Sequence, residues 1–230
     1  MKFRLTLVFF VVLQCVFGQQ TVDTTSIDSN YREDQFYVSI AYNLLNKIPD
    51  GLTQSGFSSG LHLGFIRDLP INKKRNVALG IGMGLSSNSF NQNMLIQKEN
   101  SEFIYSIIDE SETSFTKNKF TMYILEMPIE FRWRTSTASD YKFWRLYPGF
   151  KFGYVFANSS KYSGSPSDIK VSKNPDFNSL QYGLTLSAGY DTWNVHFYYA
   201  LNPIFNKDVK IGNESLEVSV IKIGLIFYIL

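Results

Sequence analysis

The chain has 230 residues, of which 16% are aromatic and only 18% carry a charge, against roughly 25% charged residues in an ordinary soluble domain. So much apolar surface excludes an intrinsically disordered chain. Lys and Arg number 22 and Asp and Glu 20, and two of the basic residues, Lys2 and Arg4, lie in a segment that we expect to be removed. The remaining chain is neutral, which excludes a strongly basic, nucleic-acid-binding surface as a global feature.

The first 18 residues have the pattern of an export signal. Lys2 and Arg4 precede the apolar run 5–13, which suits a signal peptide and is too short to span a bilayer. We place cleavage after Gly18. A lipoprotein signal with Cys15 as acceptor is the alternative, but Gln14 stands where such signals have a small residue. Cleavage would leave a chain without cysteine, and hence without disulfides.

Residues 19–34 are polar, and we expect them to form a flexible N-terminal tail on the periplasmic side. From residue 35 to the end, apolar and small or polar residues alternate with the period of two that is typical of β-strands. In the clearest run, Leu79 and Ile81 alternate with Gly80 and Gly82. The alternating runs cover residues 36–44, 61–65, 77–85, 123–133, 150–156, 180–190, 193–201 and 221–229.

The connections between these eight runs also alternate in length. The long ones cover residues 46–56, 88–119, 157–176 and 202–216, whereas the short ones cover 70–74, 135–141 and 190–192. Short turns at one end and long loops at the other are typical of outer-membrane barrels, in which the turns are periplasmic and the loops extracellular. The sequence therefore predicts an all-β fold over residues 35–230: an up-and-down, eight-stranded antiparallel transmembrane β-barrel.

A soluble, lipocalin-like barrel is the competing fold. It would place apolar side chains inside and charges outside. Here one face of the runs carries large aliphatic and aromatic residues, and the other is rich in Gly, Ala, Ser and Thr. The first face suits lipid and the second suits a crowded lumen, so we favour the membrane barrel. Closure would pair the backbone polar groups, as hydrocarbon requires.

Five charged residues share the predicted lumenal face of two neighbouring runs: Glu126, Glu130, Arg132, Arg145 and Lys151. We expect Glu130 to lie near Arg145 and Glu126 near Lys151. A paired-carboxylate glycosidase site is one interpretation. A lumenal ion-pair network is the other, since buried charges need partners and eight strands enclose room for little more than side chains. We favour the network, and predict neither an open channel nor a catalytic, cofactor or metal site.

Two further expectations concern residues on the predicted lumenal face. His62 and His196 point inward by parity, whereas the site of a lipid-modifying barrel enzyme should face the membrane, so a non-enzymatic role is expected. Pro128 lies within a run and lacks the N–H that a strand ladder uses, so we expect a local bulge there.

The chain ends on a pattern that resembles the C-terminal signal read by the barrel-assembly machinery. Its polar, glycine, aromatic and apolar positions are Lys222, Gly224, Phe227 and Ile229. An ordinary last strand would alternate in the same way. If the pattern is a signal, the assembly machinery is a partner, together with outer-membrane lipid.

The stretch LEMPIEFRW (125–133), followed by Tyr147-Pro148-Gly149 and Gly153-Tyr154, resembles the PorT-like outer-membrane barrel family of Bacteroidota. The architecture is also similar to that of small OmpX and OmpA barrels. The resemblance covers residues 35–230 and implies a structural or accessory component of a cell-envelope complex, including the type IX secretion and gliding machinery. The alternative is a stand-alone barrel whose extracellular loops, above all residues 88–119, bind an external partner.

Overall fold

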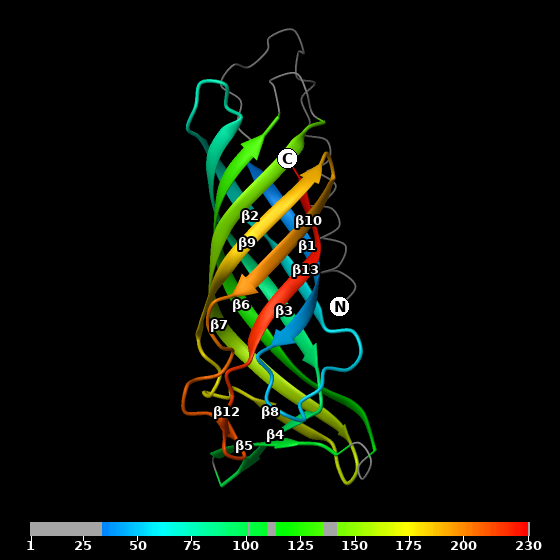
Figure 1. Ribbon diagram of the computed structural model, residues 1–230. Helices are drawn as coiled ribbons and strands as arrows, with labels where there is room; N and C mark the ends of the chain where they lie inside the picture. The colour runs from blue at the N-terminus through cyan, green and yellow to red at the C-terminus, as the bar shows by residue number, and fades with distance from the viewer. Residues whose placement is uncertain (1–33, 101, 110–113, 136–141, 230) are drawn as a thin grey trace, which may run out of the picture. The chain divides into compact units, whose positions relative to one another are not determined.

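Eight long antiparallel strands close into a barrel in the computed structural model, which describes residues 34–100, 102–109, 114–135 and 142–229 (Figure 1). The predicted signal peptide and residues 19–33 of the predicted tail lie outside the described residues. The barrel strands are β1 (Gln35–Asn46), β2 (Ser59–Pro70), β3 (Val77–Asn91), β6 (Phe115–Arg134), β7 (Trp144–Gly164), β9 (Leu180–Tyr190), β10 (Trp193–Ala200) and β13 (Ser219–Ile229).

Each barrel strand pairs with its neighbours in chain order, and β1 pairs with β13 to close the cylinder. The predicted eight-stranded antiparallel barrel is therefore confirmed. Short strands decorate one end of it: β4 (Met94–Glu99), β5 (Glu102–Ile107), β8 (Ile169–Ser172), β11 (Lys210–Ile211) and β12 (Glu214–Ser215). Among the described residues, no helix is long and apolar enough to cross a membrane.

Alternation along each strand separates an outer wall from a lumen, because successive side chains of a strand point to opposite faces. On β3, Met83 is 65% exposed on the outer wall, whereas Ala78 is fully buried in the lumen. The predicted assignment of the two faces is confirmed by this pattern.

The two ends of the barrel differ. The turn end carries the short connections, the start of β1 and the end of β13, and the loop end carries the long connections (Figure 1, top and bottom). The turn-end connections are residues 71–76, 135–143 and 191–192. The loop-end connections are residues 47–58, 92–114, 165–179 and 201–218.

In two of the predicted loops, barrel strands continue well beyond their predicted ends. Residues 88–91 belong to β3 and 115–119 to β6, and β7 continues to Gly164. With 20 and 21 residues, β6 and β7 are about twice as long as the roughly 9–11 residues that cross a bilayer. Hydrophobic alternation fades where the strands leave the apolar band, but cross-strand pairing continues, which is why the sequence pattern ended too early.

The predicted bulge at Pro128 is wrong. Pro128 lies opposite Lys151 in an unbroken register with β7, and the nearest register shift of this strand pair lies between Tyr123 and Ile124. On the β3 side the ladder resumes at Ile129 in the same register. The missing N–H thus interrupts pairing locally without inserting a residue.

Exposed aromatic side chains flank the aliphatic part of the outer wall. Near the turn end, Trp144 and Tyr190 are 60% and 44% exposed, with ring centroids 5.3 Å apart. Toward the loop end, Tyr123, Tyr154 and Phe156 are exposed on β6 and β7, and we name these three residues the loop-end girdle. An apolar band between two aromatic girdles is typical of outer-membrane barrels.

Candidate functional site

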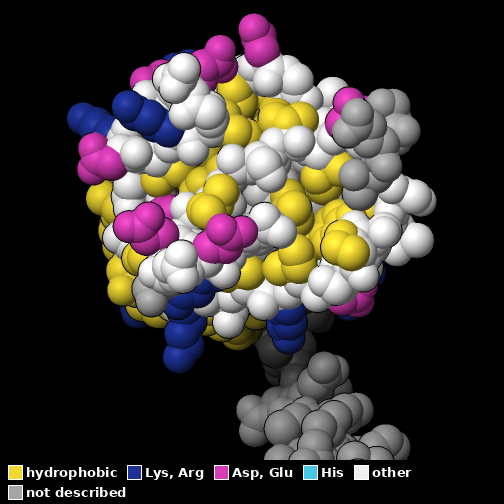
Figure 2. Space-filling view, turned by 90° about the horizontal axis from the view of Figure 1, so that it is seen from below, with side chains coloured by type: hydrophobic (Ala, Val, Ile, Leu, Met, Phe, Trp, Pro, Cys, Tyr) yellow, Lys and Arg dark blue, Asp and Glu magenta, His cyan; other side chains and the backbone are white. Residues whose placement is uncertain are grey.

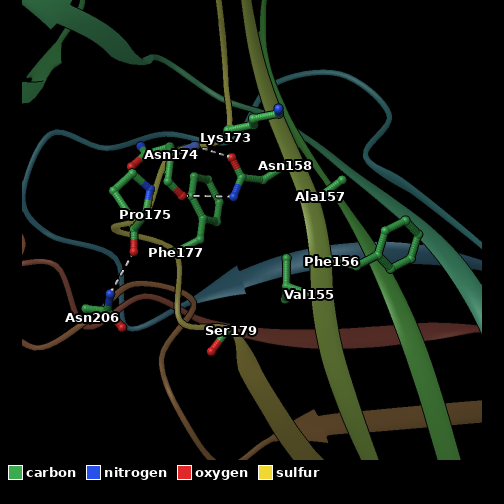
Figure 3. A pocket seen from close by; sticks show the side chains of 10 residues that line it. All are labelled: Val155, Phe156, Ala157, Asn158, Lys173, Asn174, Pro175, Phe177, Ser179 and Asn206. Atoms are coloured by element: carbon green, nitrogen blue, oxygen red, sulfur yellow. Dashed lines mark hydrogen bonds between the residues drawn. The ribbon is translucent and has the colours of Figure 1, made fainter. Parts of the chain in front are cut away.

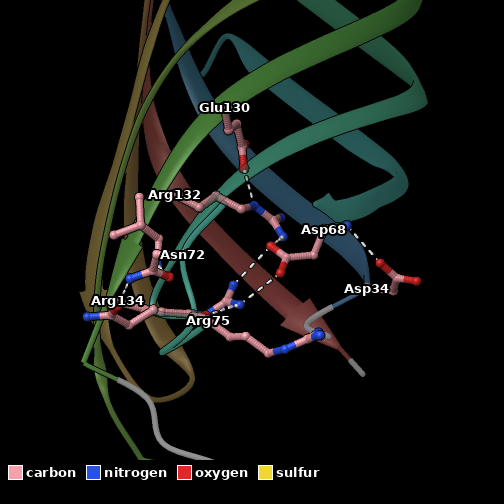
Figure 4. Close-up of polar contacts among 9 residues, drawn as sticks. Asp34, Asp68, Asn72, Arg75, Glu130, Arg132 and Arg134 are labelled. Atoms are coloured by element: carbon pink, nitrogen blue, oxygen red, sulfur yellow. Dashed lines mark hydrogen bonds and ion pairs between the residues drawn. The ribbon is translucent and has the colours of Figure 1, made fainter. Parts of the chain in front are cut away.

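The lumen at the turn end is filled by buried ions (Figure 4). Asp68 on β2 accepts hydrogen bonds from Arg134 at both carboxylate oxygens, at 2.9 and 2.8 Å, and from Arg132 at 3.1 Å. Arg132 Nε also lies 3.1 Å from Glu130 Oε2. The backbone N–H of Asp68 donates to Asp34 just before β1, at 2.7 Å. The ion pairs join β2 to β6, and the hydrogen bond to Asp34 joins β2 to the start of β1.

The Arg132 guanidinium also lies between two aromatic rings. Its centre is 5.0 Å from the ring of Tyr147 on β7 and 5.7 Å from that of Tyr228 on β13. The two rings meet edge to face, with centroids 5.6 Å apart. Cation–π contacts of this kind are stronger when the cation is removed from water, so Arg132 links opposite walls of the lumen.

A second polar layer lies in the middle of the barrel, around Glu126 on β6. Its carboxylate accepts from Ser86 Oγ at 2.8 Å and lies 3.0 Å from His62 Nδ1 and 3.3 Å from Lys151 Nζ. Lys222 Nζ donates to Asn88 Oδ1 at 2.6 Å nearby on β3. Glu126 is 2% exposed, so these contacts replace the water that its charge has lost.

The predicted residues are thus all lumenal, but not all paired as expected. Glu126 does lie beside Lys151. The predicted proximity of Glu130 to Arg145 is wrong, because the register sets Glu130 opposite Gly149 and Arg145 opposite Arg134. Arg145 instead donates to the backbone carbonyl of Asp191 and lies over the ring of Phe143, 4.1 Å from its centroid.

Sequence reasoning missed three central members of the two layers: Asp68, Ser86 and Arg134. Alternation along the strands would have placed all three in the lumen. Asp68 and Ser86 alternate with the outward residues of their strands, and Arg134 lies on the same face as Arg132. Each lies near or beyond the end of a predicted run, where the alternation used to identify lumenal residues was no longer counted.

The carboxylates of Glu126 and Glu130 both face cations. Their oxygens accept from His62, Ser86, Lys151 and Arg132 rather than facing an open cleft. A glycosidase would have to present these oxygens to a sugar, so the contacts favour the ion-pair network.

A Ser–His pair lies on another part of the lumen wall. Ser187 Oγ is 2.8 Å from His196 Nδ1, and Tyr228 Oη donates to Ser187 at 3.2 Å. Ser187 and His196 are 1% and 4% exposed and point inward. A serine nucleophile needs contact with its substrate, and the sheet separates this pair from lipid at the outer wall.

The loop end of the lumen is closed by an apolar layer, which we name the cap core. Phe120 on β6 stacks on Phe90 at 4.9 Å and meets Phe177 edge to face at 5.6 Å. Phe177 lies 4.7 Å from Phe205. The other buried members are Leu52, Met94, Ile96, Tyr105, Met122, Ile124, Val155, Tyr198, Ala200, Ile204, Val209, Leu216, Val218 and Val220. All four loop-end connections contribute side chains to this core.

Polar contacts also join the loops to one another. Tyr105 on β5 donates to Asp176 at 2.8 Å and accepts from Asn174 Nδ2 at 2.8 Å. Burial raises the pKa of Tyr105 well above its ordinary value; the Asn174 amide opposes this shift and the Asp176 carboxylate adds to it. Tyr105 therefore stays a neutral donor that ties the β4–β5 hairpin to the β8–β9 connection.

Figure 2 looks onto the loop end: hydrophobic side chains reach the surface among polar ones, and charged side chains project mainly from its margin. A cavity of about 290 Å³ lies at the side of the cap, between β7 and the segment that follows β8 (Figure 3). Phe156, Asn158, Lys173, Phe177 and Asn206 are among the residues that line it.

The four residues of the predicted assembly signal lie on β13. Lys222 and Gly224 face the lumen, and the backbone of β1 lies so close to Gly224 that a side chain would collide with it. Phe227 and Ile229 face outward, and Phe227 packs edge to face on Trp193 at 5.6 Å. Their role in assembly stays a prediction.

Comparison with known proteins gives a family and a distant structural likeness. The family described as "Outer membrane protein beta-barrel domain" matches residues 17–206. The crystal structure of Ail, the attachment invasion locus protein of Yersinia pestis, is similar over 84% of this chain and 97% of that chain, with 14% identity and a TM-score of 0.36. No curated protein matches the sequence. The narrower PorT-like resemblance stays a prediction.

Proposed function

Because the chain belongs to the outer membrane protein beta-barrel domain family, we propose that it is a non-enzymatic outer-membrane barrel whose loop end presents a binding surface. In this proposal the turn end and both termini are periplasmic and the loop end faces the cell exterior, the usual arrangement of such barrels. The partner is then either a molecule outside the cell or another protein of the envelope.

The packed loop end is the observation that carries this proposal. Phe120, Phe177 and Phe205 come from three separate parts of the chain and bury one another, and Tyr105 bonds to the connection after β8. Loops that are ordered before binding lose less conformational entropy when a partner docks. A barrel that served only as a membrane anchor would have no need of such a layer.

The filled lumen supports a scaffold role rather than transport. Its turn-end and middle layers consist of mutually paired charges, and the cap core covers them at the loop end. Transport of solutes would require these layers to separate, with buried ions losing their partners. The geometry thus favours a closed scaffold over a pore.

Deletion of a whole loop would be a poor test of loop binding, because the loops are part of the cap core. Deleting residues 88–119 would remove Phe90, Met94, Ile96 and Tyr105 from the cap core and expose the rest of it. Changing a single exposed residue is a more specific test, because it leaves the cap core intact. Ile104 on β5 is 42% exposed at the loop end, and Ile71 is 63% exposed at the turn end.

The test is a photo-crosslinking residue at position 104 or at position 71, in cells that carry the full chain. A discrete adduct from position 104, weakened by Lys98→Glu or Glu102→Lys on the same hairpin, supports a partner on the loop end. Adducts only from position 71 would support a periplasmic accessory role instead, such as one in the type IX secretion machinery that the sequence resemblance implies. Adducts from neither position would contradict both roles.

A further inference from the structure

Three lysines lie directly opposite one another on the extension of the barrel beyond the loop-end girdle. Lys119 on β6 pairs with Lys161 on β7, and Lys161 pairs with Lys170 on β8. We name these residues the lysine row. Directly opposite residues of antiparallel strands have Cβ atoms about 4.5–5.5 Å apart, and like charges so placed destabilise the sheet. A bound anion would offset this repulsion.

The row faces the outer wall. The neighbours of its members, Phe120, Tyr162 and Val171, are buried on the inner face, so alternation turns the lysines outward. Lys161 and Lys170 are exposed and Lys119 is half-buried. Within the described part of the chain, no ion pair joins the three lysines to a carboxylate.

The height of the row above the apolar band matches lipid headgroups. Lys119 lies four residues beyond Tyr123 of the girdle, which is about 13 Å along a strand and about 9 Å along the membrane normal at a strand tilt of about 45°. The polar headgroup layer is roughly 5–8 Å thick on each side, and a lysine side chain can reach back into it. The positions between the girdle and the row are polar: Thr121 pairs with Ser159, and Ser159 pairs with Ser172.

A fourth lysine extends the row to the cavity beside the cap. The backbone N–H of Lys173 donates to the carbonyl of Asn158 at 3.2 Å. The Asn158 side chain exchanges two hydrogen bonds with the backbone of Asn174, at 2.8 and 2.9 Å (Figure 3). Lys173 is thereby held next to β7, at a cavity that Phe156 of the girdle also lines.

We propose that the lysine row, with Lys173 at its margin, binds the phosphate groups of a lipid headgroup in the leaflet at the loop end. The occupant is a phosphorylated lipid rather than free phosphate, because the row stands directly above the girdle, where acyl chains and headgroups meet. Lysines on an edge strand also discourage pairing with a further strand. That role covers Lys170 on β8 but not Lys119 and Lys161, whose strands are paired on both sides.

The test uses the full-length mature barrel in a zwitterionic detergent. It is titrated with lipid A carrying two phosphates, with dephosphorylated lipid A and with sodium phosphate, and binding is followed by native mass spectrometry. Each lysine removed in K119Q/K161Q/K170Q should weaken binding of the phosphorylated lipid about fivefold. The charge-matched variant K98Q/K207Q/K210Q, at the same end but outside the row, should change binding less than about twofold.

Thermal unfolding provides a second readout that does not depend on the triple variant. Without lipid, Lys161→Gln should raise the unfolding temperature, because Lys161 is opposed by a like charge on both sides. With phosphorylated lipid, the same variant should gain less stability than the wild type.

Equal lipid binding by the triple variant and wild type would overturn the proposal, as would equal affinity for the dephosphorylated lipid. Saturation of the row by sodium phosphate at the same concentration would overturn the choice of a lipid.

Discussion

Lys222 on the last strand donates a hydrogen bond of 2.6 Å to Asn88 on β3, 134 residues earlier in the chain. In the sheet, β1 and β2 separate these two strands, so the bond crosses the lumen rather than running along the wall. Lys222 also lies 4.9 Å from the ring centroid of Tyr198. Contacts of this kind make the polar interior a structural element of the barrel.

Asp68→Ala should destabilise the barrel by about 3–5 kcal/mol, because Arg132 and Arg134 would each lose a buried carboxylate partner. Replacing Asp68 and Arg134 together with leucine should cost less than the single change. Urea unfolding in lipid vesicles, followed by the mobility shift between unboiled and boiled samples, measures both. If the costs of Asp68→Leu and Arg134→Leu simply add up in the double variant, the pair is not coupled.

A charged residue on the outer wall between the two girdles should lower the stability of the barrel. Ile81→Arg is expected to cost about 2–4 kcal/mol, because the guanidinium would meet hydrocarbon. The same change at Ile71, which is exposed in a turn-end connection, should stay within about 0.5 kcal/mol. The same vesicle assay compares them, and similar costs at the two positions would contradict the assignment of the outer wall.

The cap core should contribute strongly to stability. Phe120 is fully buried and contacts three other aromatic rings, so Phe120→Ala should cost about 3–5 kcal/mol. Phe57, 66% exposed at the same end, is the matched control and should cost about 0.5 kcal/mol or less. In limited proteolysis, Phe120→Ala should also expose the loop connections to cleavage. Resistance equal to that of the control would argue against a cooperative cap.

The intact protein should show no steady currents of porin size in planar bilayers. Charged layers fill the turn-end half of the lumen and apolar side chains fill the loop end, and an eight-stranded barrel is just wide enough for side chains. Currents that persist in the wild type would mean that the lumen opens, and a transport role would then have to replace the scaffold.

The amino-acid sequence alone was sufficient for the strand count, the antiparallel order and the two faces of the barrel. Alternation is local information: a one-residue step turns a side chain from lipid to lumen. It therefore placed Ile81 outside and Glu126 and Lys151 inside without any knowledge of distant contacts.

The tertiary structure decided which lumenal charges meet and what the loops build. Cross-strand register places Glu130 opposite Gly149, and parity, which is blind to shifts of two residues, could not exclude Arg145 as its neighbour. The cap core joins Phe120 to Phe205, residues that are distant in the chain and carry no shared periodicity. Partners of this kind are selected by how the closed barrel brings strands and loops together, because burial rewards contacts in space rather than spacing along the chain.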